Sequence, residues 1–376
     1  MSVLGGILNS LVSIAILGDD EAADFESETH DNRAVEAMEQ IMKEPFQPSV
    51  EDVLATKESL LNKLPIEIVD FIIDFAEYWP HTHIGVKQNS AIDSHRITAG
   101  INEDEFLLRS YPLGYIPREN DPTDLSFQTQ GFATHPPLPG YDCTRYYQDC
   151  TRKTLQLWAE ESNIRGEFPC RKIVFTLQSH DQGWGGIAGC RGTYTNSFTW
   201  FDVGKEEVCL FEKPISRQAE FSNSEGPEIS YNIFDVPYFV LSPSLLIHVE
   251  SSDEINVICT SQTISPTTNS NIGSSDLKVH SFNHPLLPDS NVLQKNVAAV
   301  IESKKHVITW SYDDHIDPES LAADGLEKIG RGRATGNGEF VRSLKCGQIV
   351  TVWGKSRFRN WISHVEEVTI DIYWAV

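Results

Sequence analysis

Apolar and polar positions alternate most clearly in the middle of the chain. In RKIVFTLQ, residues 171–178, the side chains of Ile173, Phe175 and Leu177 fall on one face of an extended strand. The glycine-rich stretch SHDQGWGG then ends this strand and holds Trp184 in a loop. TYTNSFTWF, residues 193–201, resumes with β-branched and aromatic residues, which are typical of a half-buried strand. The stretch therefore predicts strand, loop and strand.

The C-terminus repeats this pattern. VTVWG (350–354) and VTIDIYW (368–374) are predicted strands, and the RFRNW loop between them again carries a tryptophan, Trp361. Two strand pairs, each with an aromatic loop, indicate one β-sandwich built from the middle and the end of the chain.

Shorter segments complete the predicted sheets. The remaining strand-like segments are SAIDSHRITAG (90–100), EFLLRSYPLGYIP (105–117), FQTQGFATHPPLPGYD (127–142), EVCLFEKP (207–214), YNIFDVPYFVLSP (231–243), LLIHVESSDEINVICTSQT (245–263) and HVITWSY (306–312). TRKTLQLWAEES, residues 151–162, is compatible with either a strand or a short helix. No 20–50-residue period appears, which excludes a solenoid or a propeller. We expect a mainly β protein, an antiparallel, jelly-roll-like sandwich with a short helical N-terminal segment.

The N-terminal part differs in composition and suggests three regions. Residues 1–17 are apolar and uncharged, and residues 19–58 hold 13 acidic side chains against 3 basic ones, as in a solvated linker. We expect an apolar segment and acidic linker over 1–58, a helix over 59–82, and a single β-sandwich domain over 83–376. Residues 1–17 lack the basic residues of a secretory signal and are just short of a membrane span. They are interpreted as a short element docked on the core or, alternatively, as a membrane-surface or self-association segment.

LLNKLPIEIVDFIIDFAEYWPHT, residues 60–82, predicts an amphipathic helix. Asn62 is the expected cap, and Pro65 lies in the first turn. Two apolar stripes follow, Ile68, Ile72, Phe75 and Trp79 on one and Ile66, Val69, Phe71 and Ile73 on the other. A helix that is apolar on two sides must be covered on both, either by its own chain or by a partner.

This helix resembles the first helix of an F-box. The motif LP-x-E-I-x-x-x-I is matched by Leu64, Pro65, Glu67, Ile68 and Ile72. The match ends at Trp79-Pro80, where an F-box continues for about two more helices, so the F-box is truncated. The resemblance implies docking to the adaptor of cullin-type ubiquitin ligases through Leu64, Pro65, Ile68, Ile72 and Phe75. In the alternative interpretation, the same helix caps the sandwich.

The chain is also similar to a group of uncharacterised fungal proteins over residues 60–82 and 171–376. The shared blocks are SHDQGWGG…GTYTNSFTWF, ITWSYDD…GRGRATGNGEFVRSLK and VTVWGKSRFRNW…IDIYWAV. The group implies no activity.

Composition restricts the partners. A net charge of −24 argues against nucleic acid and anionic membranes as partners, with residues 1–17 as the one candidate membrane segment. The seven cysteines form no CxxC pair, which indicates free thiols in a reducing compartment, the cytoplasm or the nucleus. No HExxH, GxSxG or GxGxxG motif is present, and we expect no cofactor, no metal and no catalytic residue.

Two loop regions are candidate ligand sites. His180, Asp181, Gln182 and Trp184 combine an aromatic ring with hydrogen-bonding groups, as sugar or peptide recognition requires. Arg331 and Arg333 lie in the glycine-rich GRGRATGNG, which suits a carboxylate or phosphate, and Trp361 belongs to the second aromatic loop. Alternatively, Asp181 binds local amides, Trp184 folds onto the sheet and the arginines pair within the chain.

The sequence therefore predicts a non-enzymatic intracellular recognition protein. It would combine an F-box-like helix with a β-sandwich that binds a protein or glycan ligand, as the substrate receptor of a ubiquitin ligase does. One alternative is a lectin-like carbohydrate-binding module without a ligase role. A second is a jelly-roll enzyme whose site the sequence does not identify.

Overall fold

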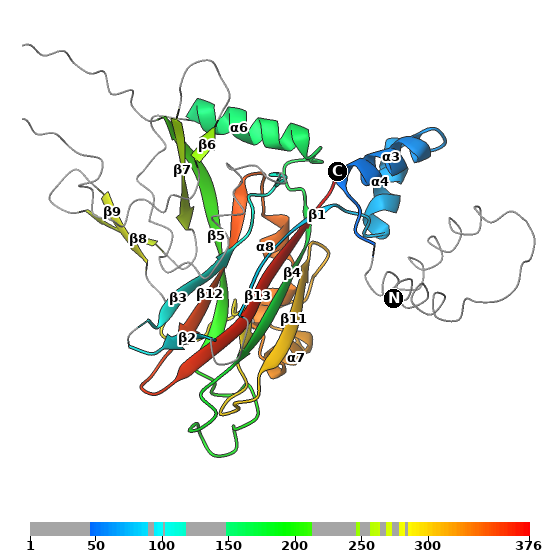
Figure 1. Ribbon diagram of the computed structural model, residues 1–376. Coiled ribbons are helices and arrows are strands. Elements are labelled where there is room, and N and C mark those ends of the chain that lie inside the picture. The colour runs from blue at the N-terminus through cyan, green and yellow to red at the C-terminus, as the bar shows by residue number, and fades with distance from the viewer. Residues whose placement is uncertain are drawn as a thin grey trace, which may run out of the picture. The chain divides into compact units, whose positions relative to one another are not determined.

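The computed structural model describes residues 46–88, 94–100, 102–117, 148–212, 246–248, 256–263, 268–272, 278–282 and 285–376 (Figure 1). It divides into two compact units. Unit 1 extends to His81 and includes Val376, and unit 2 is Thr82–Ala375. The predictions for the apolar segment 1–17, for most of the acidic linker and for the stretches 127–142 and 231–243 lie outside the described residues.

Unit 1 contains two helices, α3 (Val50–Leu61) and α4 (Ile66–Phe75). α3 begins at a capping box, in which the Ser49 hydroxyl accepts from the Asp52 amide and the Asp52 carboxylate accepts from the Ser49 amide. This helix occupies residues that the sequence analysis had assigned to the linker. Asn62 is the C-cap of α3, not the N-cap of the second helix. α4 follows Pro65, which is extended and provides no side-chain cap.

The core of unit 1 is small and lies between the two helices. Val53, Val69, Ile73 and Trp79 are buried, and the Trp79 indole N–H donates to the Asp74 carboxylate at 2.9 Å. Lys57 of α3 pairs with Asp70 of α4 at 2.8 Å. Burial between α3 and α4 therefore uses only one side of α4.

Unit 2 consists mainly of two antiparallel sheets, which confirms the expected mainly β, sandwich-like fold. The first has the order β1 (His81–Lys87), β13 (Ile362–Trp374), β4 (Cys170–His180), β11 (Lys304–Ser311), with β2 (His95–Thr98) also on β13. The second has the order β3 (Asp104–Arg109), β12 (Gln348–Ser356), β5 (Thr199–Glu212), β7 (Asn256–Thr263), β6 (Leu246–His248), with β10 (Gln294–Lys295) on β5. β8 (Thr268–Ile272) and β9 (Lys278–Phe282) form a separate pair. These strand orders do not by themselves define a jelly roll.

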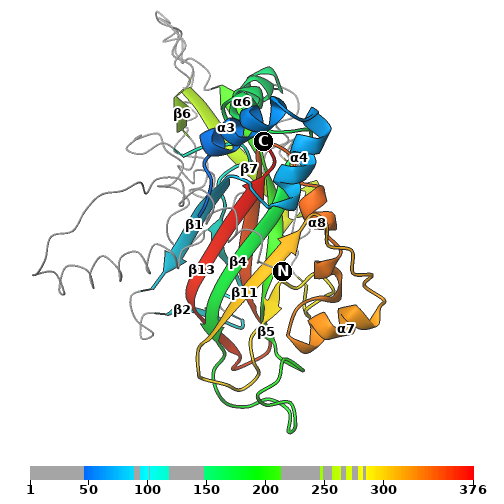
Figure 2. The same cartoon turned by 90° about the vertical axis from the view of Figure 1, so that its right-hand side faces the viewer.

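Helical segments accompany the sheets. They are α6 (Gln148–Glu161), α7 (Leu321–Lys328), the 3₁₀ turn η3 (Arg333–Gly336) and α8 (Glu339–Arg342). α6 settles the open assignment of residues 151–162 in favour of a helix. Figure 2 shows β1, β13, β4 and β11 side by side, with α7 and α8 next to β11.

The two aromatic loops cross between the sheets. β4 pairs with β13 and β11, whereas β5 pairs with β12, so neither predicted strand pair is a hairpin. Both stretches are strand, loop and strand, as predicted, but the two strands of each stretch belong to different sheets. EVCLFEKP is likewise not a separate strand, because β5 continues without a break to Glu212.

The core between the sheets is mainly apolar and contains a buried polar cluster around Asn296. Alternate residues of β4 and β13 are buried, and β12 is buried along nearly its whole length. The buried side chains include Phe175, Leu177, Val368, Ile370, Phe201, Val350 and Val352. Within this core the Asn296 side chain accepts from Ser179 at 2.7 Å and donates to Thr199 at 3.0 Å and Ser363 at 2.9 Å. Ser179 and Ser363 belong to the first sheet and Thr199 to the second, so Asn296 joins the two.

Candidate functional site

The most apolar exposed surface of unit 1 lies on α4. Four large apolar residues on one side of this helix are exposed to 36–74%: Ile68, Phe71, Ile72 and Phe75, called here the α4 surface. Phe71 and Phe75 stack with their ring centroids 6.1 Å apart. Of the five predicted docking residues, Ile68, Ile72 and Phe75 lie in this surface, Pro65 is exposed beside it and Leu64 is half-buried.

Asp181 holds its loop from within. Its buried carboxylate accepts from the backbone amides of Gly183 at 2.8 Å, Val300 at 3.0 Å and Ala299. Burial raises the pKa of Asp181, and these amide bonds oppose the shift. The Asp181 carboxylate is therefore bonded to local amides and is not exposed on the surface, where a ligand would bind.

Gln182 links the two aromatic loops. Its amide nitrogen donates to the Trp184 carbonyl at 2.8 Å, and its amide oxygen accepts from the Ile362 amide at 3.1 Å. Trp184 is 54% exposed, whereas Trp361 is 8% exposed and packs edge-on against Phe198, with ring centroids 5.1 Å apart. The structure thus brings both loops to one end of the sandwich, and of the two tryptophans only Trp184 is presented to solvent.

His180 belongs to a histidine pair on the outer face of the first sheet. Its ring stacks on His364 with centroids 4.6 Å apart, and its Nε2 lies 4.0 Å from the Glu366 carboxylate. Burial, with His180 and Arg96 nearby, lowers the pKa of His364. Within the described residues, no group of three or more His, Cys, Asp or Glu side chains is arranged to hold a metal ion.

Arg331 and Arg333 are engaged within the segment that contains α7 and η3. Arg333 donates to the Pro318 carbonyl at 2.9 Å and pairs with Asp324 and Glu327 of α7. Arg331 donates to the Thr335 carbonyl at 3.2 Å, and burial lowers its pKa. These contacts match the alternative in which the arginines pair within the chain.

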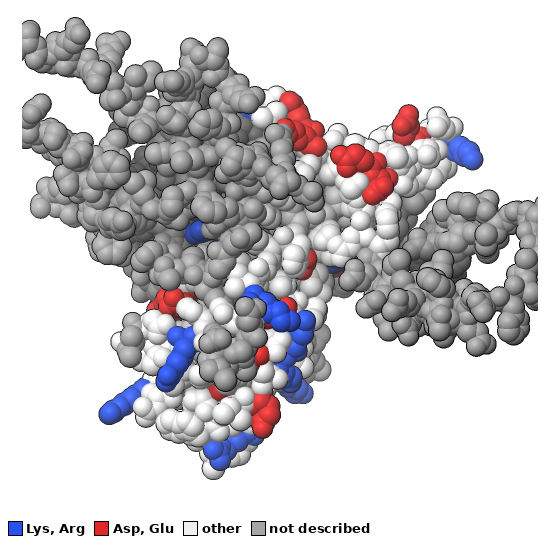
Figure 3. Space-filling model, viewed as in Figure 1, with Lys and Arg blue, Asp and Glu red and all other residues white. Residues whose placement is uncertain are grey.

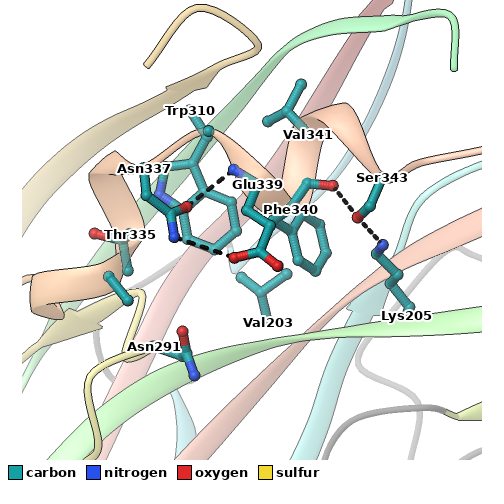
Figure 4. A pocket seen from close by; sticks show the side chains of 12 residues that line it. Val203, Lys205, Asn291, Trp310, Thr335, Asn337, Glu339, Phe340, Val341 and Ser343 are labelled. Carbon is teal, nitrogen blue, oxygen red and sulfur yellow. Dashed lines mark hydrogen bonds between the residues drawn. The ribbon is translucent and has the colours of Figure 1, made fainter. Parts of the chain in front are cut away.

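Sequence reasoning missed a pocket between β5 and β11. The cavity measures about 410 Å³ and is lined by side chains from β5, β11, η3 and α8, together with Asn291 (Figure 4). The Trp310 and Phe340 rings meet edge to face at 5.2 Å, and the Lys205 ammonium lies 4.9 Å from the Phe340 centroid and donates to the Ser343 hydroxyl. The only local signal was the Asn-Gly pair before α8, where Gly338 adopts a left-handed φ of 71°.

Basic and acidic side chains are interspersed on the visible surface of unit 2 (Figure 3). Figure 3 shows Lys and Arg side chains spread over the visible face of unit 2, with Asp and Glu between them. Lys305 of β11 and Lys87 of β1 approach Glu367 of β13 from opposite sides of that strand, at 3.6 and 3.7 Å. No helix among the described residues is long and apolar enough to cross a membrane.

The fold and these surfaces define a two-unit protein with a helix pair and a sandwich-like β unit. Comparisons of this chain with models of protein families, with curated proteins and with solved structures find no match.

Proposed function

We propose that this chain is a recognition protein that binds a partner protein through the α4 surface. The observation that carries the proposal is the exposure of four large apolar side chains on one side of α4, while Val69 and Ile73 on its other side are buried. Covering such a side chain contributes about 1.5–3 kcal/mol, so a partner that buries the surface gains substantial free energy. The exposed carboxylates of Glu67 and Glu77 flank this surface and favour a partner with a basic rim.

The partner is the adaptor of cullin-type ubiquitin ligases. The resemblance to an F-box supports this choice, and two of its motif residues, Ile68 and Ile72, lie in the α4 surface. The β-sandwich then serves as the module that selects a ligand or substrate, and the chain acts in the cytoplasm or nucleus.

The test is a binding titration between the purified full chain and the purified adaptor. Wild type is compared with the double variant Ile68→Asp/Ile72→Asp, which places two charges on the α4 surface. We expect at least a hundredfold loss of affinity, because burying an unpaired carboxylate is costly. Leu157→Asp is the matched control, since Leu157 is an apolar helix residue of α6 that is 51% exposed. This control should bind the adaptor as wild type does.

Circular dichroism and thermal unfolding establish that each variant is folded. A wild-type chain that does not bind the adaptor, or a folded double variant that binds it equally well, contradicts the proposal. If wild type does not bind the adaptor and the double variant unfolds, we would conclude that α4 packs against its own chain and does not dock a partner.

A further inference from the structure

The rim of the pocket between β5 and β11 is fixed at Asn337 and Gly338. The Arg342 side chain ties this part of the rim to the segment after β11, because it donates to the carbonyls of Asn337 at 2.6 Å, Tyr312 at 2.6 Å and Asp314 at 2.9 Å. Gly338 leaves no room for a side chain, since an added Cβ would meet the carbonyl oxygens of Asp314 and Ser311. The rim is therefore fixed before any ligand arrives, which lowers the entropic cost of binding.

The pocket walls combine opposite charges with aromatic rings. Lys205 provides an ammonium group and Glu339 a carboxylate, while Asn291 and Asn337 add amides that both donate and accept. Trp310 and Phe340 form the apolar part (Figure 4). Glu339 and Asn291 are exposed, so the polar groups are accessible from solvent.

This chemistry selects among ligand classes. An anion would meet the carboxylate of Glu339, and a cation would meet the ammonium of Lys205. An apolar ligand would displace water from the exposed Glu339 carboxylate and the Asn291 amide and would offer neither a hydrogen bond. A neutral ring with many hydroxyls satisfies all of them, because each hydroxyl both donates and accepts and the C–H faces pack on aromatic rings.

We propose that this pocket binds a neutral carbohydrate, at most a few sugar rings in size. The cavity of about 410 Å³ lies in the range of small-molecule sites. This site is separate from the α4 surface and from the Trp184 loop, where sequence reasoning placed ligand binding. The inference does not rest on adaptor binding.

The test is saturation-transfer NMR of the full chain with glucose, galactose, mannose, N-acetylglucosamine and lactose, followed by titration of the best ligand. We expect at least one sugar to bind. Glu339→Ala, at an exposed position, should lower its affinity at least tenfold, and Ala334→Phe, which narrows the pocket, should abolish binding. Glu319→Ala is the matched control, since Glu319 is an exposed carboxylate outside the pocket lining.

Three outcomes would overturn the inference. The first is that none of the five sugars binds. The second is that affinity falls in Trp184→Ala but not in Glu339→Ala, which moves the site to the aromatic loops. The third is that glycine or phenylalanine, tested in parallel, binds in place of sugars, which identifies a zwitterion site. The Ile68→Asp/Ile72→Asp variant should still bind the sugar, so failure of adaptor docking leaves this result unchanged.

Discussion

At the residue scale, Asn296 is the side chain that ties the two sheets together. It is 1% exposed and bonds to Ser179, Thr199 and Ser363. We predict that Asn296→Ala lowers the free energy of unfolding by about 2–4 kcal/mol, because three buried hydroxyls lose a partner. Urea denaturation measures the change. The exposed Asn291 is the control, and Asn291→Ala should change stability by no more than about 0.5 kcal/mol.

His306 should make stability depend on pH. Burial, with Lys304 nearby, lowers the pKa of His306 from 6.5 to about 4, and its Nε2 lies 2.9 Å from the Tyr194 hydroxyl. The unfolded chain therefore binds the proton first as pH falls, and the free energy of unfolding decreases from about pH 6.5 down to about pH 4. His306→Gln should remove this part of the pH dependence. Urea midpoints of both proteins at pH 7.5 and 5 measure it, and an equal drop in both would show that His306 contributes nothing.

The roles of single residues were only partly predictable from the sequence. Trp184 and Trp361 stand in similar aromatic loops, and both were expected to meet a ligand. Trp361 is covered because Phe198, from the other crossing loop, lies against it. Such a contact joins residues 163 positions apart and leaves no trace in the local pattern.

At the element scale, the start of α3 offers a test of capping. We predict that Ser49→Ala lowers the stability of unit 1 by about 1 kcal/mol, since the Asp52 amide loses its acceptor. Hydrogen exchange of the α3 amides measures the effect. Ser59→Ala removes an exposed hydroxyl that bonds only the Ala55 carbonyl of the same helix, and it should leave this exchange nearly unchanged. Equal effects of the two substitutions would argue against the capping box.

Elements with a strong period were predictable, whereas their pairing was not. The alternation in β4, β11 and β13 identified these strands, because each buries every second side chain. α3 was missed because its acidic residues, Glu51, Asp52 and Glu58, suggested a linker, although carboxylates in the first turn favour a helix. The crossings between sheets depend on long-range pairing, which local periodicity does not encode.

At the scale of the whole molecule, the candidate sites differ in how far the sequence revealed them. The α4 surface follows from the helical period of residues 66–75 and was predictable as apolar, although which side is buried depends on α3. The pocket between β5 and β11 combines Lys205, Asn291, Trp310 and Glu339 from four segments of the chain. No spacing rule joins these residues, so only the folded arrangement reveals their common chemistry.

The division into two compact units predicts that each loses its structure separately. Unit 1 has its own core around Val53, Val69 and Ile73, and unit 2 has the core between its sheets. Local opening of one unit therefore need not expose the core of the other.

Two core substitutions test this prediction. Val69→Ala should lower the stability of unit 1 by about 1–3 kcal/mol and speed hydrogen exchange in α3 and α4 only. Asn296→Ala should speed exchange in β4, β5 and β13 only. Exchange measured by mass spectrometry on the full chain distinguishes the cases, because faster exchange in both units from either substitution would mean that they unfold as one. Separate unfolding would also allow binding through the α4 surface to stabilise unit 1 while the sandwich and its pocket remain unchanged.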